Sequence, residues 1–69
     1  MSVLILQKVS HNGVSVNVLI GVHKEFYSCM RFLGATKSTK VSAAQWMVAV
    51  GDDLYTITLM EVQSYVASI

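Results

Sequence analysis

The sequence predicts an all-β domain, a five-stranded antiparallel meander that forms a curled sheet or a small barrel. Eleven of the 69 residues are valine and none is proline, a composition that favours strands. In addition, two glycine-containing turn signals each lie between segments rich in β-favouring residues. No linker or internal repeat interrupts the chain, so residues 1–69 are expected to form one small domain.

The first hairpin is predicted from the turn signal Asn12-Gly13. Both residues accept the positive φ that a type I′ turn requires. Before this turn, Ser2–Val9 is read as a strand with apolar side chains on both faces. After it, apolar residues recur at every second position over Val14–Val22, so Val14, Val16, Val18, Ile20 and Val22 are expected to share one face.

A second hairpin is predicted near the C-terminus. Trp46–Val50 forms its first arm, Gly51–Asp53 the turn and Leu54–Val62 the second arm, in which β-favouring residues alternate. A helix competes for the first arm, because Ser42–Gln45 fits a capping box. Valines at positions 48 and 50 disfavour so short a helix, so the strand is preferred. The remaining residues, 63–69, either extend the last strand or fray.

The middle segment His23–Gly34 allows two interpretations. Apolar residues have helical spacing at Phe26, Cys29, Met30 and Leu33, and Gly34 is placed to end a helix. No capping residue stands just before Lys24, however, and aromatic side chains suit a sheet. We therefore predict a strand, followed by a polar loop over Ala35–Lys40. The alternative is a ββαββ fold with one helix at about 24–33.

The composition predicts association with further copies of the chain. Hydrophobic residues make up 54% of the sequence and charged residues 13%, against about 25% charged in an average domain. Small domains usually need a disulfide, a metal or a partner subunit. The single cysteine, Cys29, excludes an intrachain disulfide, and the spacing of His11, His23 and Cys29 suits no zinc site. We expect a homo-oligomer, a dimer or larger, without metal or cofactor.

Charge and hydropathy restrict the partners and the location. The net charge is +1 and the five basic residues are dispersed, whereas nucleic-acid binding usually needs a basic excess. The longest charge-free runs, Val9–Val22 and Val41–Gly51, are shorter than the roughly 18 residues of a membrane span. No signal-peptide pattern is present at the N-terminus, and an unpaired thiol suits a reducing compartment. We expect a cytoplasmic protein, in the host cell if it is viral, without membrane contact.

The motifs of catalysis are missing from the sequence. No nucleophile elbow, phosphate-binding glycine loop or metal signature occurs, so no catalytic residue is assigned and the protein is predicted not to be an enzyme. Asp52-Asp53 is interpreted as a turn rather than a carboxylate pair. Cys29, among apolar neighbours, is interpreted as a core residue rather than a reactive thiol.

One segment stands out as a candidate binding site. The loop from Lys37 to Lys40 combines two ammonium groups with two hydroxyl groups, which together suit a phosphate or a carboxylate. Aromatic residues elsewhere could provide a stacking surface. The predicted ligand- or partner-binding residues are Lys37, Ser38, Thr39, Lys40, Trp46 and Tyr55.

These features predict a small non-catalytic binding protein. In size, β content and weak charge the chain is similar to the small orphan proteins of bacteriophages, many of which act by binding. We expect an oligomeric inhibitor that blocks a host protein or sequesters a small anionic ligand. The alternatives are a structural subunit of a virus or phage particle and, after it, a nucleic-acid-binding small barrel.

Overall fold

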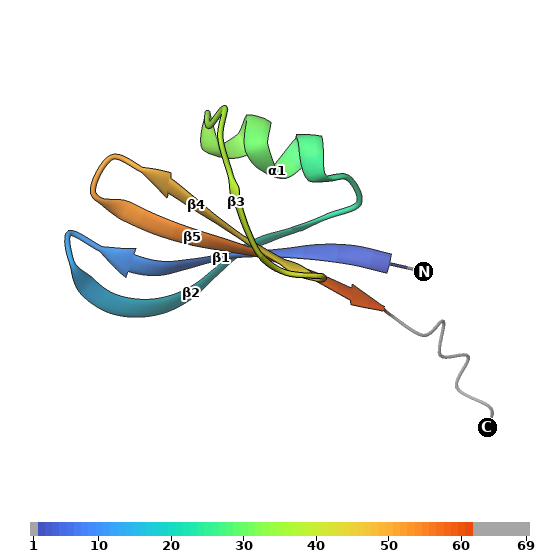
Figure 1. Ribbon diagram of the computed structural model, residues 1–69. Coiled ribbons are helices and arrows are strands. Elements are labelled where there is room, and N and C mark those ends of the chain that lie inside the picture. The colour runs from blue at the N-terminus through green and yellow to red at the C-terminus, as the bar shows by residue number, and fades with distance from the viewer. Residues whose placement is uncertain (1, 62–69) are drawn as a thin grey trace, which may run out of the picture.

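The computed structural model describes residues 2–61. It contains five strands and one helix: β1 (Ser2–His11), β2 (Val14–His23), α1 (Phe26–Leu33), β3 (Thr39–Ser42), β4 (Gln45–Val50) and β5 (Asp53–Glu61). All five strands join in one antiparallel sheet, and α1 lies on one side of it (Figure 1). The predicted β-rich fold with five antiparallel strands is confirmed.

The strand order within the sheet is β2-β1-β5-β4-β3. The N-terminal hairpin, β1 and β2, therefore pairs with the C-terminal meander of β3, β4 and β5 through the β1–β5 ladder. This ladder runs from Ser2 opposite Glu61 to His11 opposite Asp53, and it places the two hairpin turns side by side. The edge strands are β2 and β3, so the sheet described by residues 2–61 is open.

The middle of the chain is helical, and the prediction of a strand over His23–Gly34 is wrong there. Helix α1 matches the alternative at about 24–33. No side chain caps its N-terminus. At its C-terminus Gly34 has φ of 67°, its N–H donates to the Arg31 carbonyl, and the Ala35 N–H donates to the Met30 carbonyl. This Schellman motif, together with the apolar stripe buried on the sheet, stabilises the helix in place of an N-cap.

Strand β3 begins inside the segment that the sequence predicted to be a loop. The polar segment Ala35–Lys40 ends in β3, which pairs with β4. Ser42, the first residue of the alternative capping box, is the last residue of β3, and its Oγ accepts a hydrogen bond from the Ala44 N–H (3.3 Å) in the turn that follows. Strand β4 then occupies Gln45–Val50, in agreement with the preferred reading of the second hairpin.

The prediction that the valines of β2 share one face of the sheet is wrong, because the pairing of β2 with β1 is irregular. The β1–β2 register shifts between Leu6 and Gln7 and again between Lys8 and Ser10. Because an extra residue in a strand reverses the alternation beyond it, Val18 lies opposite Lys8 while Val22 lies opposite Ile5, on the other side of the sheet. The valines of β2 are thus divided between both faces.

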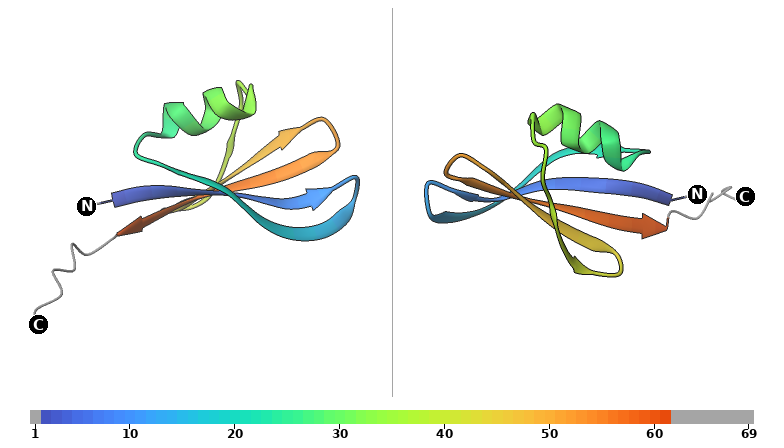
Figure 2. Two further views of the ribbon diagram at one scale, coloured as in Figure 1. Left: turned by 180° about the vertical axis from the view of Figure 1, so that it is seen from behind. Right: turned by 45° about the horizontal axis from the view of Figure 1, so that its top comes forward.

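The core lies between α1 and one face of the sheet. Its central side chains, from β1, β4, β5 and α1, are Leu4, Leu6, Val48, Ile57, Cys29 and Met30. Across the sheet Leu6 pairs with Ile57, and Ile57 pairs with Trp46, which packs at the margin of the core. Both further views show α1 over this face alone (Figure 2). We call it the helix-covered face and its reverse the helix-free face.

Candidate binding surfaces

A cleft runs between α1 and the segment that leads to β3. Its volume is about 490 Å³, and its lining comprises Phe26, Tyr27, Met30, Arg31, Ala35, Thr36 and Ser38. Met30 and Phe26 make its floor, since both also pack against the core. Ligand clefts of this size and apolar character are typical of binding sites.

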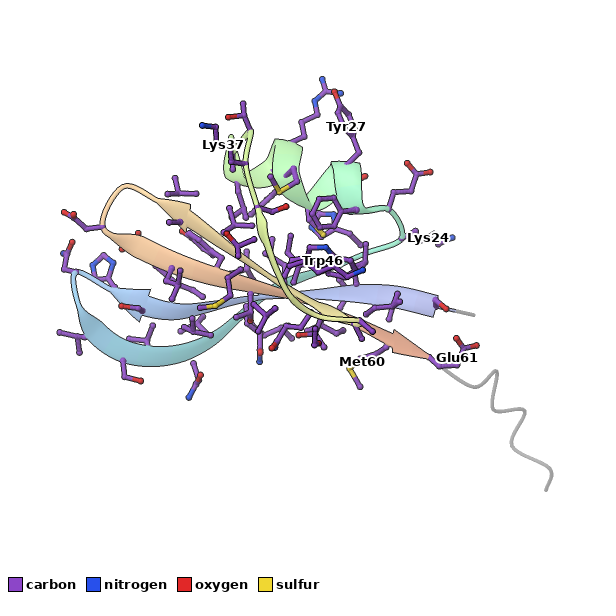
Figure 3. The ribbon with its side chains drawn as sticks, viewed as in Figure 1. Lys24, Tyr27, Lys37, Trp46, Met60 and Glu61 are labelled. Atoms are coloured by element: carbon purple, nitrogen blue, oxygen red, sulfur yellow. The ribbon has the colours of Figure 1, made fainter. Side chains whose placement is uncertain are left out.

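Tyr27 and Arg31 provide the specific groups of this cleft. They lie four residues apart on α1 and therefore share one side of the helix. The Tyr27 side chain is 70% exposed and projects away from the sheet (Figure 3). Arg31 is the one charged residue in the lining, and no lining residue is acidic. The cleft therefore suits a group that combines apolar surface with negative charge.

The predicted loop residues are distributed over different surroundings. Ser38 lines the cleft, whereas Lys37 lines a second hollow of about 340 Å³ with Gly34, Val50 and other residues. Lys40 faces Trp46 across the β3–β4 pair, with its Nζ 5.9 Å from the centre of the indole ring. Thr39 pairs with Met47 and, one residue before Lys40, points to the helix-free face. The structure brings Ser38 alone of the four into the cleft.

The two predicted aromatic residues do not form a common stacking surface. Trp46 is half-buried and its ring lies 5.2 Å from that of Phe26, tilted by 59°. Tyr55 pairs with Val48 further along the sheet, and the Lys8 Nζ lies 5.8 Å from its ring centre. Both rings pack at the margin of the core. Their predicted part in binding stays a prediction.

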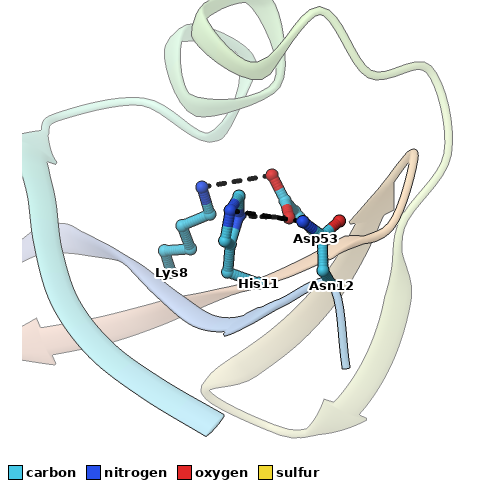
Figure 4. A network of polar contacts seen from close by, with 4 residues as sticks. All are labelled: Lys8, His11, Asn12 and Asp53. Atoms are coloured by element: carbon cyan, nitrogen blue, oxygen red, sulfur yellow. Dashed lines mark hydrogen bonds and ion pairs between the residues drawn. The ribbon is translucent and has the colours of Figure 1, made fainter. Parts of the chain in front are cut away.

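A polar network joins the two hairpin turns. Asp53 accepts at Oδ2 from Lys8 Nζ (3.1 Å), and its Oδ1 lies 2.8 Å from Nδ1 of His11 (Figure 4). The hydrogen bond from Lys8 is the largest influence that lowers the pKa of Asp53, and the same bond raises the pKa of Lys8. As predicted, Gly51-Asp52 forms a turn, whereas Asp53 already belongs to β5.

Cys29 lies in the core, as predicted. Its side chain is 0% exposed, and burial raises the pKa of its thiol. A protonated, enclosed thiol is a poor nucleophile. Within residues 2–61 no three histidine, cysteine or carboxylate side chains gather to form a possible metal site.

The helix-free face carries two continuous rows of neutral side chains. The first row, starting from β2, consists of Val22, Ile5, Thr58 and Gln45. The second row, also starting from β2, consists of Leu19, Gln7, Thr56, Met47 and Thr39. Val3 and Met60 form a further pair beside the first row. Met60 points away from the side that holds Lys24, Tyr27 and Lys37 (Figure 3).

The binding residues predicted from the sequence did not include Tyr27 or Arg31. In the predicted strand over His23–Gly34, the alternation of side chains would place both residues on the same face as Cys29. The helical spacing of Phe26, Cys29, Met30 and Leu33 could have identified them. In a helix that buries these four residues, Tyr27 and Arg31 lie on the opposite, exposed side.

Comparison with family models, curated proteins and solved structures gave no match. Over residues 2–61, the single helix has eight residues and is too short to cross a bilayer. The fold and its surfaces therefore define a small protein made of a β-sheet covered by a helix on one side, and its function is inferred from these surfaces.

Proposed function

We propose that this chain is a small non-catalytic binding protein that blocks an acidic partner protein at the α1 cleft. The observation that carries the proposal is the exposed pair Tyr27 and Arg31 at the rim of an apolar cleft without an acidic lining residue. Tyrosine and arginine are enriched among the residues that dominate binding energies. An apolar side chain of the partner fills the cleft, and a neighbouring carboxylate pairs with Arg31.

The basic residues around the cleft favour the same partner. Lys24 precedes α1, Lys37 follows it, and both lie on the side of the molecule that presents Tyr27 (Figure 3). Their charges attract an acidic surface and increase the rate of encounter, an effect that salt screens over about 8–10 Å. The expected inhibitor of phage type, which blocks a host protein, belongs to this proposal.

The test uses a synthetic peptide with one leucine flanked by glutamates, titrated calorimetrically against the full chain. Tyr27→Ala should weaken binding at least tenfold, as expected when an anchor is truncated. Phe32→Ala is the matched control, because Phe32 is also an exposed aromatic residue of α1 (62%) but lies outside the cleft and packs near His23. The control should bind as the unchanged protein does.

Charge reversal tests the role of the loop. Lys37→Glu combined with Lys40→Glu should weaken binding and reduce its salt dependence, with a melting temperature within a few degrees of the unchanged protein. A peptide with glutamine in place of glutamate should bind weakly. Equal losses in Tyr27→Ala and Phe32→Ala, or no binding of the acidic peptide, would contradict the proposal. If adenosine monophosphate binds instead, the protein sequesters a small anion.

A second candidate function, that of a structural subunit, is favoured by the exposed apolar residues of the helix-free face. Leu19, Val22 and Met60 are all at least half exposed there. A structural subunit grows into large assemblies without a partner, and light scattering of the purified chain distinguishes it from an inhibitor.

A further inference from the structure

All nine charged side chains of the protein lie off the helix-free face. Four are on strands, and their registers place them on the helix-covered face: Lys8, Lys40, Asp53 and Glu61. The other five belong to α1 or to loops and turns: Lys24, Glu25, Arg31, Lys37 and Asp52. The alternation of a strand permits such a separation, but the low total charge does not require it.

The helix-free face is also rich in exposed apolar side chains. Leu19 is 59% exposed, and Val22 and Met60 are each about half exposed. Thr56 lies at the centre of the face and is buried between its neighbours. Depletion of charged residues distinguishes the cores of protein interfaces from ordinary surface. The face therefore has the composition of an interface.

We infer that the helix-free face is the contact surface between two copies of this chain, related by a two-fold axis. In a two-fold interface each residue near the axis meets its own counterpart, so a charged residue there would face its own charge. This face has no such residue. Threonine and glutamine, which supply its polar groups at Thr56, Thr58 and Gln7, both donate and accept hydrogen bonds and so pair with their own copies.

A foreign partner fits this face less well than a second copy. Selectivity for a foreign protein commonly depends on complementary charge, and the helix-free face offers none. The two sheets would pack face to face about 10 Å apart, as in a β-sandwich. Each α1 cleft then remains exposed on the outside of the dimer, so this inference and the proposed function are independent.

The size of the face indicates a dimer of moderate affinity. Four interstrand spacings of about 4.8 Å and a strand length of about 23 Å give a projected area of roughly 440 Å². This projected area is smaller than the roughly 600–1,000 Å² that each partner buries in standard interfaces. We therefore expect a dissociation constant on the order of micromolar.

Two neighbouring residues of β2 provide a matched test. Leu19 points to the helix-free face and Val18, 49% exposed, to the helix-covered face. Sedimentation equilibrium of the full chain should show a monomer–dimer equilibrium. Leu19→Glu should raise the dissociation constant at least tenfold, whereas Val18→Glu, whose new carboxylate lies beside Lys8, should leave it within twofold. Circular dichroism verifies that both variants are folded.

A measurement on the unchanged protein tests the same interface without relying on the folding of any variant. In a dilution series followed by NMR, the amides of Gln7 and Thr58 should shift with concentration, and those of Tyr27 and Arg31 should not. A monomer at 100 µM, an assembly larger than a dimer, or a dimer lost in Val18→Glu but kept in Leu19→Glu would each overturn the inference. A monomer would indicate that residues 62–69 or a foreign protein cover the face.

Discussion

Asp53 Oδ1 lies 2.8 Å from the Nδ1 atom of His11, although 42 residues separate them in the chain. The contact links the turn of the N-terminal hairpin to the turn of the C-terminal hairpin. It exists because β1 and β5 pair with His11 directly opposite Asp53. Lys8 reaches the second carboxylate oxygen, so one carboxylate contacts two side chains of β1, Lys8 and His11.

This network predicts a loss of stability in acid. The pKa of Asp53 is lower in the folded protein than its ordinary value of 3.8, chiefly because of the hydrogen bond from Lys8. Its stabilising contribution is therefore complete above that value and disappears as the pH falls through the lower, folded pKa. Asp53→Asn should be less stable than the unchanged protein at pH 7, and the difference should shrink at pH 3 and below.

Urea unfolding at both pH values measures this difference. Asp52→Asn is the control, since Asp52 is the neighbouring exposed residue of the turn. A stability gap between Asp53→Asn and the unchanged protein that is the same at both pH values would refute the role of this carboxylate.

The first hairpin turn predicts a backbone effect at Gly13. Asn12 and Gly13 have φ of 51° and 80°, as a type I′ turn requires. No atom lies within 4 Å of a Cβ placed on Gly13, so any cost arises from the backbone alone. Gly13→Val should lower the free energy of unfolding by about 1–3 kcal/mol, and Gly13→Asn by less, because asparagine tolerates positive φ. Equal melting temperatures for both variants would contradict this.

The buried thiol predicts slow chemical modification. Cys29 is enclosed by the core and burial raises the pKa of its thiol. In native buffer an aromatic disulfide reagent should react with Cys29 far more slowly than with the same chain in 6 M guanidinium chloride. Rapid reaction in native buffer would show that the packing of α1 on the sheet opens frequently.

Among the substitutions considered, truncation of Ile57 is expected to cause the largest loss of stability. Ile57 is 0% exposed and contacts the core from the central strand β5. Ile57→Ala should cost about 2–5 kcal/mol, which for so small a domain approaches the whole stability. Leu59→Ala, two residues further and 41% exposed, should cost much less. Thermal unfolding followed by circular dichroism compares them, and similar losses would argue against the described core.

The sequence alone determined the strands and turns whose signals are local. Asn12-Gly13 specifies its own turn, because the φ values that the turn needs are properties of those two residues. The alternating residues of β5 likewise identify a strand without reference to any partner. The assignment of Cys29 to the core followed from its apolar neighbours.

The tertiary structure decided the features that depend on distant contacts. Helix α1 lacks an N-terminal cap, so an eight-residue segment of mixed propensity becomes helical because its apolar stripe is buried on the sheet. The faces of β2 depend on the irregular register with β1, which moves Val18 and Val22 to opposite sides. Tyr27 and Arg31 lie together at one cleft, and every charged side chain lies off the helix-free face. Both arrangements depend on contacts between segments far apart in the chain, which local patterns do not encode.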